Sequence, residues 1–331
     1  MDRSAFPRPC GRISEPPRLN DFPASLRPAL AALSPRKKYL IGVSGGCDSM
    51  VLLHVLHQQG YQNLIVCHLH HGLRGKAATR DATLVRTTAK RLGYACEVER
   101  VQTATAARRD KKSLELAARD LRLNFFATCA RKHRCPRLLL AHHADDQVET
   151  CLFHFLRGSG ASGLAGIRPV SRIGRLEVFR PLLTVPRSTL AAWADENKIP
   201  HHEDATNTSP VHTRNRLRHE VLPAVLRVMP SCQAAILRTA DILREEDAWM
   251  ESLVPSPPTR LKTRELRTFP LALQRRLVLR WLTQQGVPEA GFQETTRVLS
   301  LLNSDDGPAK INLPGNHHAR RRNGEIFLEK F

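Results

Sequence analysis

Short apolar runs alternate with longer amphipathic stretches along much of the chain. An apolar run at residues 39–43 leads into a turn of small residues, then a stretch over residues 50–59 that ends at Gly60, then a second run at 64–68. This order predicts a strand, a helix and a parallel strand. Similar patterns predict helices at 78–92, 113–131 and 186–197 and strands at 95–101, 137–141 and 176–179. We therefore expect an α/β fold with a doubly wound, mostly parallel sheet of the Rossmann-like kind.

The pattern changes after about residue 220. Residues 231–253 have the periodicity of an amphipathic helix, residues 255–258 form a proline-containing linker, and residues 271–285 predict a helix with arginines on its polar side. Near the C-terminus, Asn323-Gly324 separates two strand-like runs, which is the strongest short-range signal for a β-hairpin. A smaller helical plus β-hairpin domain is therefore predicted.

These patterns divide the chain into three segments. Residues 1–35 are rich in proline and lack periodicity, which predicts a flexible extension, with a transit peptide as the alternative. Residues 36–220 are expected to form the α/β domain, and residues 221–331 a linker helix followed by the smaller domain.

Charge is the most unusual feature of the composition. The 331 residues include 51 Lys and Arg against 31 Asp and Glu, a formal charge of +20. This excess predicts a polyanionic partner, with nucleic acid favoured over an acidic membrane surface. A hydrophobic content of 41% excludes a disordered basic tail. No apolar stretch has the length of a signal peptide or a membrane span, so we expect a cytoplasmic protein.

The eight cysteines are scattered, and the closest two are Cys129 and Cys135. No C-x-x-C pair occurs, which argues against a zinc ribbon and a redox dithiol. The cysteines are therefore interpreted as reduced thiols.

The turn after the first predicted strand has the composition of a phosphate-binding loop. Small residues at 44–46 and Ser49 let a phosphate approach the backbone N–H groups at the start of a helix. Asp48 supplies a carboxylate that suits Mg²⁺ beside a polyphosphate. A Walker loop is excluded because no Gly-Lys-Ser/Thr is present. The alternative is a tight turn in which Asp48 only caps the helix.

Two more polar segments follow predicted strands, at the sheet edge where ligands bind in such folds. The first contains His70, His71 and Arg74; a metal site or a solvated loop are its alternatives. The second contains Asp146 and Glu149, three residues apart on the opening turn of a helix, where both can face one cation. Favourable interaction with the helix dipole is the alternative for these two acids.

One predicted helix carries Glu115, Arg119 and Arg122 at spacings of three and four residues. The spacing fits ordinary ion pairing within the helix. It also fits arginines that neutralise charge developing on a phosphate during nucleotidyl transfer.

Read together, these segments carry a family resemblance. The turn at residues 44–49 resembles the SGGxDS loop of the PP-loop (N-type) ATP pyrophosphatases, which cleave ATP between the α- and β-phosphates. The motifs H-x-x-H-G-L-R, E-x-x-A-R-x-x-R, A-H-H-x-D-D-Q-x-E-T and R-G-S-G-x-x-G-L follow in order and are similar to those of the tRNA(Ile)-lysidine synthase family. Further similar positions are Arg180, Glu203, Asp204, Asn207 and the segment 214–223. The resemblance covers about residues 39–225, and residues 231–331 resemble the family's substrate-binding domain more weakly, as in a short form.

The resemblance implies a ligase that joins lysine to the wobble cytidine of a tRNA(Ile) with a CAU anticodon, through an adenylated cytidine. It implies ATP and Mg²⁺ as cofactors, and tRNA and free lysine as partners; a homodimer stays open. It assigns residues 36–220 to a PP-loop catalytic domain and residues 221–331 to tRNA binding.

The same resemblance assigns roles to single residues. ATP would be held by Ser44, Gly45, Gly46, Cys47, Asp48 and Ser49. Asp48 would also hold the metal, and Arg122, with Arg119, would stabilise the α-phosphate. Lysine would be bound by Asp146 and Glu149, and tRNA by Arg157, Arg214 and Arg218. His71 and His142 are the candidates for the base that deprotonates lysine, and His70 stands where the family usually has Asp or Asn.

Two other classes stay open. A sulfur-transferring tRNA enzyme uses the same loop but usually needs paired cysteines, which this spacing does not show. A non-catalytic RNA-binding protein on a nucleotide-binding fold is the second alternative, against which the acids Asp48, Asp146 and Glu149 argue.

Overall fold

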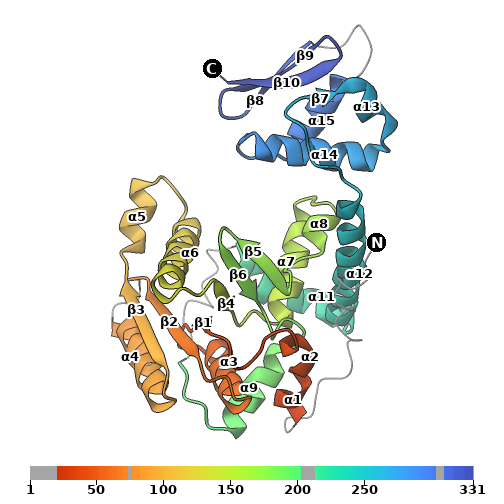
Figure 1. Cartoon of the computed structure of the whole chain (residues 1–331). Coiled ribbons are helices and arrows are strands. Elements are labelled where there is room, and N and C mark those ends of the chain that lie inside the picture. The colour runs from red at the N-terminus through yellow and green to blue at the C-terminus, as the bar shows by residue number, and fades with distance from the viewer. Residues whose placement is uncertain (1–20, 74–75, 203–212, 303–308, 331) are drawn as a thin grey trace. The chain divides into compact units, whose positions relative to one another are not determined.

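The computed structural model describes residues 21–73, 76–202, 213–302 and 309–330. The chain divides into two compact units, Met1–Ile242 and Leu243–Phe331, and each is described by itself (Figure 1).

The first unit is built on a six-stranded sheet in the order β3-β2-β1-β4-β6-β5. The strands are β1 (Tyr39–Gly42), β2 (Leu64–His70), β3 (Ala95–Arg100), β4 (Arg137–Leu139), β5 (Val170–Ile173) and β6 (Leu176–Phe179). All pair in parallel except the edge strand β5, which pairs antiparallel with β6. The predicted mostly parallel, doubly wound sheet is confirmed.

Alternate residues of the central strands face opposite layers. Tyr39 and Ile41 pack in the core cluster with residues of α3 (Cys47–Gln58), α4 (Lys76–Arg91) and α9 (Arg187–Glu196). Leu40, between them, packs on the opposite face with Phe125 and Phe126 of α6 (Leu114–His133). Strands buried on both faces need apolar residues at every position, which explains the continuous apolar runs of the sequence.

The beginning of the described chain differs from the expected extension of residues 1–35. Short helices α1 (Phe22–Ser25) and α2 (Arg27–Leu30) place Phe22, Leu26, Leu30 and Leu33 in the same core cluster as β1 and α3. The Phe22 ring meets Trp193 of α9 edge-on, with centroids 5.7 Å apart. The apolar residues are spaced three or four apart, so they bury one helical face although prolines interrupt the pattern. Residues 1–20 lie outside the described residues.

The remaining elements of the first unit follow the parallel strands. They are α5 (Thr103–Arg109), α7 (Ala144–Leu156), α8 (Ala161–Leu164), α10 (Thr213–Arg216), the π-helical turn η4 (Leu217–Val221), α11 (Leu222–Val228) and α12 (Cys232–Ser252), which runs on past Ile242. Val148 of α7, Leu222 and Cys232 form a small core of their own. In η4 the Leu222 N–H bonds to the Leu217 carbonyl, five residues back. Pro223 follows, and a proline cannot donate the next helical hydrogen bond, which favours such a widened turn.

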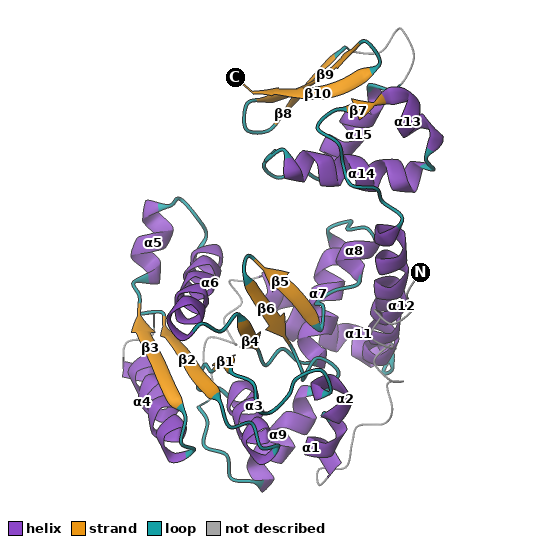
Figure 2. Ribbon diagram, viewed as in Figure 1, coloured by secondary structure: helices purple, strands orange, loops and turns teal. Residues whose placement is uncertain are grey.

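The second unit combines helices with a four-stranded sheet (Figure 2). Its elements are β7 (Leu261–Lys262), α13 (Thr263–Thr268), α14 (Leu271–Gln284), α15 (Phe292–Ser300), β8 (Lys310–Leu313), β9 (His317–Arg322) and β10 (Glu325–Lys330). The sheet order is β7-β10-β9-β8, with antiparallel pairs. Asn323 and Gly324 both have positive φ, 51° and 75°, as a two-residue hairpin turn requires. The predicted helical plus hairpin domain is confirmed.

No single helix of the described chain is both long and apolar enough to cross a membrane; the bent pair Leu217–Val228 and Cys232–Ser252 passes only when the two are counted together.

Candidate active site

The predicted site residues gather at the carboxyl ends of β1, β2 and β4. The strand order reverses between β1 and β4: β1 is followed along the chain by β2 on one side, and β4 is followed by β5 and β6 on the other. In doubly wound folds, ligands bind at the carboxyl ends of the strands at such a reversal (Figure 1). Residues 44–49 follow β1, the histidines at 68–71 end β2, and residues 142–149 follow β4.

Hydrogen bonds of its own serines stabilise the predicted phosphate loop. The Ser44 N–H donates to Ser49 Oγ at 3.1 Å, the Gly46 N–H donates to Ser44 Oγ at 3.2 Å, and Ser49 Oγ donates to the Gly46 carbonyl at 3.0 Å. Gly45 has φ +94°, a conformation that L side chains rarely adopt. The loop is therefore a pre-shaped turn at the N-terminus of α3, where the helix dipole favours an anion.

Residues from distant parts of the chain hold this loop in place. His68 Nδ1 donates to the Val43 carbonyl at 2.9 Å. The His202 N–H donates to the Gly45 carbonyl at 3.0 Å, and His202 Nδ1 lies 2.7 Å from Asp81 Oδ1. A Cβ on Gly45 would stand 3.2 Å from the Asp81 Cβ. The sequence did not indicate Asp81 or His202, because they are 121 residues apart and match no local motif.

Cys47 fills the variable position of the loop. Burial, followed by the nearby Asp48 carboxylate, raises the pKa of the Cys47 thiol to about 11. The group therefore stays a protonated thiol near neutral pH, which matches its expected lack of a redox role.

His143 connects the phosphate loop to the acids after β4. It caps α7: the His143 N–H donates to Asp146 Oδ2 at 3.0 Å, and the Asp146 N–H donates to His143 Nδ1 at 3.4 Å. Its Nε2 lies 3.6 Å from Asp48 Oδ2. Burial alone would lower the pKa of His143, but the carboxylates of Asp48, Asp146 and Asp145 outweigh it and raise this pKa. His143 is thus a buried histidine whose side chain lies between two predicted binding sites, with Nδ1 toward Asp146 and Nε2 toward Asp48.

Asp48 has a second oxygen that suits a cation. Its Oδ1 is buried and has no hydrogen-bond partner among the described residues. The Arg187 Nε lies 4.0 Å from it, at the edge of ion-pair distance. A carboxylate oxygen without a hydrogen bond is a ligand that Mg²⁺ accepts, so the residue fits the predicted metal role.

Arg187 was not predicted as a site residue. It opens α9, and its N–H donates to Asp145 Oδ2 at 2.8 Å. A basic residue directly after Pro186, at the start of a helix, is the sequence signal that could have indicated it.

Asp146 and Glu149, predicted to bind lysine, meet Arg218, predicted to bind tRNA. Arg218 Nε donates to Glu149 Oε1 at 2.5 Å, and its Nη2 lies 3.4 Å from Asp146 Oδ1. Burial raises the pKa of Glu149 despite the Arg218 guanidinium, which opposes the rise. Arg218 belongs to the π-helical turn, which brings it to α7 across 69 residues of sequence. The pair of acids therefore has a cation of the chain's own beside it.

A small pocket of about 200 Å³ opens beside this ion cluster. It is lined by Asp145, Glu149, Arg187, Arg218, Leu222, Pro223, Leu226 and Gln233. Carboxylates, guanidinium groups and an apolar wall together suit a zwitterion with an aliphatic chain.

The predicted arginines of α6 contribute to a basic side of the site. Arg119 and Arg122 are exposed, and in the described chain neither forms an ion pair with Glu115, the simpler alternative for their spacing. Burial, followed by the opposing charges of Arg180 and Arg122, lowers the pKa of His142 to about 4, although Asp146 counteracts this. His142 is therefore neutral at physiological pH, a form that can accept a proton but binds it weakly.

The histidines after β2 have local partners. His70 Nδ1 accepts a hydrogen bond from the Gly72 N–H at 3.1 Å. An Asp or Asn side chain makes the same bond to the residue two positions on, so His70 preserves the turn expected of the usual Asp or Asn. His71 Nδ1 lies 3.1 Å from Thr103 Oγ1. No group of three or more metal-binding side chains was found within the described ranges.

The remaining predicted residues lie outside this cluster. Arg157 ends α7, and its guanidinium lies 5.1 Å from the centre of the Phe153 ring. The backbone of Arg214 belongs to α10. Outside the described residues lie Arg74, Glu203, Asp204 and Asn207.

Comparisons with known proteins agree with this geometry. A model of the PP-loop domain family matches residues 20–225, and a model of the TilS substrate binding domain matches residues 261–327. The chain is similar to the tRNA(Ile)-lysidine synthase of Solibacter usitatus, with 36% identity over 83% of this chain and 63% of that protein. It is also similar to the tRNA(Ile)-lysidine synthase of Thermosynechococcus vestitus, with 32% identity over 86% of this chain and 83% of that protein.

The chain spans between 56% and 63% of the length of its relatives from Solibacter usitatus and from two Bacillus species. Among solved structures, it is similar to the U34-tRNA thiolase NcsA from Methanococcus maripaludis. The TM-score is 0.58 at 16% identity, and the match covers 69% of this chain and 80% of that one. This likeness shows the shared fold.

Proposed function

The chain belongs to the tRNA(Ile)-lysidine synthase family of PP-loop proteins, and on that basis we propose that it joins lysine to the wobble cytidine of a tRNA(Ile) with a CAU anticodon. ATP would first adenylate the 2-oxygen of the cytosine and release pyrophosphate. The amine of lysine would then attack the activated carbon and release AMP. The oxygen must first become a leaving group, because a cytosine carbonyl is otherwise inert to an amine.

One observation carries the proposal: a continuous chain of ionisable side chains links the phosphate loop to the acidic pocket. Asp48 faces His143, His143 caps the helix that carries Asp146, and Asp146 and Glu149 share Arg218. A nucleotide on the loop and an amine in the pocket would therefore lie on the two sides of His143. Such proximity is what a two-step ligation needs, since the amine must reach the carbon that the first step activates.

The loop would hold ATP through its backbone N–H groups and the N-terminus of α3. Asp48 would hold Mg²⁺ through Oδ1, and a bound Mg²⁺ would neutralise charge on the phosphates. Arg122, with Arg119, would stabilise the α-phosphate while it is attacked. Both arginines are exposed to solvent, and the charge of Arg122 acts on His142.

The pocket beside Glu149 would bind lysine. Its carboxylates would pair with an ammonium group, its guanidinium groups with the lysine carboxylate, and Leu222, Pro223 and Leu226 with the aliphatic chain. Arg218 already balances the charge of Asp146 and Glu149. The ammonium group of lysine would therefore have to share these two carboxylates with Arg218 or displace it. Arg218 would in this way contribute to the selection of lysine.

The charge distribution supports tRNA as partner. Residues 1–242 carry +17 of the formal charge of +20, and residues 243–331 carry +3. Phosphate neutralisation by the first unit would supply affinity that does not depend on sequence. Arg157 and Arg214 are proposed as contacts of this kind, whereas Arg218, the third arginine predicted to bind tRNA, is held in ion pairs with Asp146 and Glu149.

The proposal is tested by following AMP formation from ATP with purified protein and Mg²⁺. Pyrophosphate should be released when the tRNA(Ile) transcript is present, and AMP should appear only when lysine is added as well, because the second step releases AMP. Asp48→Asn is the matched negative variant. AMP formation that ignores tRNA, or that Asp48→Asn leaves unchanged, would contradict the proposed order of steps.

A further inference from the structure

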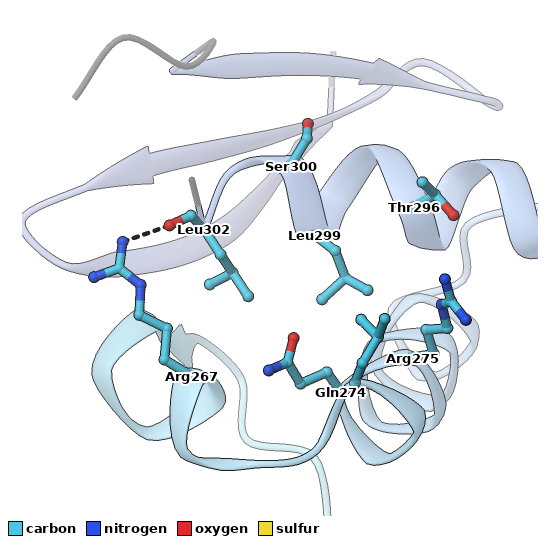
Figure 3. Close-up of a pocket in the computed structure, with 8 residues that line it drawn as sticks. Arg267, Gln274, Arg275, Thr296, Leu299, Ser300 and Leu302 are labelled. Atoms are coloured by element: carbon cyan, nitrogen blue, oxygen red, sulfur yellow. Dashed lines mark hydrogen bonds between the residues drawn. The ribbon is translucent and has the colours of Figure 1, made fainter. Parts of the chain in front are cut away.

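The second unit has an open pocket that no motif of the sequence indicated. Its volume is about 400 Å³, a size that admits one nucleotide. It is lined by Arg267, Leu271, Gln274, Arg275, Thr296, Leu299, Ser300 and Leu302 (Figure 3).

Three helices supply these side chains. Leu271, Gln274 and Arg275 lie three and four residues apart, so they share one face of α14. Thr296 and Leu299 share the facing side of α15, and Arg267 comes from α13. Figure 3 shows Gln274 and Leu299 opposite each other, with Arg267 on one side and Arg275 on the other. The pocket thus has an apolar wall between two guanidinium groups.

The charge of this pocket is unbalanced, although the unit is nearly neutral. Carboxylates elsewhere in the unit are paired: Asp247 and Glu251 with Arg276, and Glu325 with Arg260. Within the described ranges no ion pair includes Arg267 or Arg275, and Arg267 Nη2 instead donates to the Leu302 carbonyl. Two cations without a carboxylate favour an anionic ligand.

An exposed aromatic ring stands beside the pocket. Phe292 is 67% exposed and precedes Thr296 by one helical turn, and the guanidinium of Arg275 lies 5.2 Å from its ring centre. An exposed phenylalanine next to an arginine is a surface on which a nucleic-acid base can stack. A paired base cannot stack there, since its faces are covered by its neighbours in the helix.

Polar side chains of the pocket could form hydrogen bonds with the edge of a nucleic-acid base. Gln274 Nε2 donates to the Phe269 carbonyl at 2.8 Å, which fixes the amide and leaves its Oε1 as an acceptor. The Thr296 side chain is exposed on the same wall. Ser300 contributes less, because its hydroxyl donates to the Arg297 carbonyl at 2.7 Å.

We propose that this pocket binds one unpaired nucleotide of the tRNA, with the base against Phe292 and the leucines and the phosphate between Arg267 and Arg275. The inference rests on the proposed function for the identity of the RNA. It adds a contact that chooses single-stranded RNA, whereas the charge of the first unit attracts any RNA backbone.

The test compares four variants of the full chain: Arg267→Gln, Arg275→Gln, Phe292→Ala and, as control, Arg264→Gln. Arg264 is exposed on α13, like Arg267, but does not line the pocket. The affinity for a tRNA(Ile) transcript is measured at several salt concentrations. Phe292→Ala should weaken binding by about fivefold or more, the effect of losing one stacked base. Each pocket arginine variant should lower the salt slope by about one relative to Arg264→Gln.

A competition experiment tests the preference for an unpaired nucleotide. A short single-stranded RNA should displace the transcript from wild-type protein better than from Phe292→Ala, and a blunt RNA duplex should show no such difference. The pocket assignment would be overturned if Phe292→Ala changed displacement by the single strand and by the duplex equally. It would also be overturned if the pocket variants bound the transcript with the same affinity and salt slope as Arg264→Gln, as expected if the pocket binds a protein segment instead. Wild-type protein that binds no tRNA would instead contradict the proposed function.

Discussion

Asp48 is the single residue on which the proposed nucleotide chemistry would depend most. Its Oδ2 faces His143 and its Oδ1 is buried without a hydrogen bond among the described residues. Asp48→Asn removes the charge while keeping the shape, so we expect AMP formation to fall by about a thousandfold, the effect of losing several kcal/mol of metal-assisted stabilisation. Affinity for tRNA, measured by filter binding, should stay unchanged. Asp110→Asn, at an exposed pair with Arg109, is the control and should keep full activity.

Glu149 tests the assignment of the lysine pocket. Glu149→Gln removes a charged hydrogen-bond partner, which is worth enough to raise the KM for lysine by about 10- to 100-fold. The KM for ATP should change little, because the proposed nucleotide site lies on the other side of His143. Glu220→Gln is the matched control, since Glu220 lies in the same π-helical turn but pairs with exposed Arg216. Equal effects on lysine and ATP would place the amine elsewhere.

His142 gives a prediction about pH and stability. Its folded-state pKa of about 4 lies below the unfolded value near 6.5, because burial and two arginines disfavour the charged form. The unfolded chain therefore binds the proton first, so stability is lost as pH falls from about 6.5 toward 4. Thermal unfolding at pH 7.5 and pH 5 should show a smaller loss of Tm for His142→Gln than for wild type. An identical loss would mean that His142 titrates normally.

At the scale of elements, the backbone conformation of the phosphate loop depends on Gly45. Gly45→Ala forces a side chain into φ +94° and places its Cβ 3.2 Å from that of Asp81, so Asp81 or the loop must shift by a few tenths of an ångström. Gly60→Ala is a matched control, since Gly60 has φ +79° but nothing within 4 Å of a Cβ. Both variants should lose about 1 kcal/mol of unfolding free energy from backbone strain. AMP formation should fall in Gly45→Ala and stay near normal in Gly60→Ala.

Elements with strong local signals were predictable. The unit formed by β1, the loop and α3 follows from an apolar run, small residues and a helical stretch, and the β9–β10 hairpin follows from Asn323-Gly324. Elements that depend on distant packing were missed. The helices α1 and α2 contain prolines and are stabilised by Trp193, and β5 is a short edge strand that exists through pairing with β6.

The candidate site also combines segments that the sequence predicted with contacts between distant residues that it could not predict. Loops 44–49 and 142–149 were predicted as separate candidates, and parallel strands bring both to one edge. No local pattern could place Arg218 on Glu149, because that contact depends on the π-helical turn before Pro223. Nor could the sequence indicate that His202 and Asp81 hold Gly45, since the two meet only in the folded sheet.

At the scale of the whole molecule, the two units have different charge. The first carries +17 and contains the phosphate loop and the acidic pocket. The second carries +3 and has two guanidinium groups at one pocket, neither of them in an ion pair with another described residue. Under our two proposals, the first unit would attract RNA in general and the second would select an unpaired nucleotide.

Transfer of labelled lysine to tRNA tests the central claim most directly. The protein is incubated with ATP, Mg²⁺, labelled lysine and either an isoleucine tRNA transcript with a CAU anticodon or an elongator methionine tRNA transcript. We predict label in the isoleucine transcript alone, with AMP formed in equal amount. Binding of both transcripts without any label in either would contradict the account.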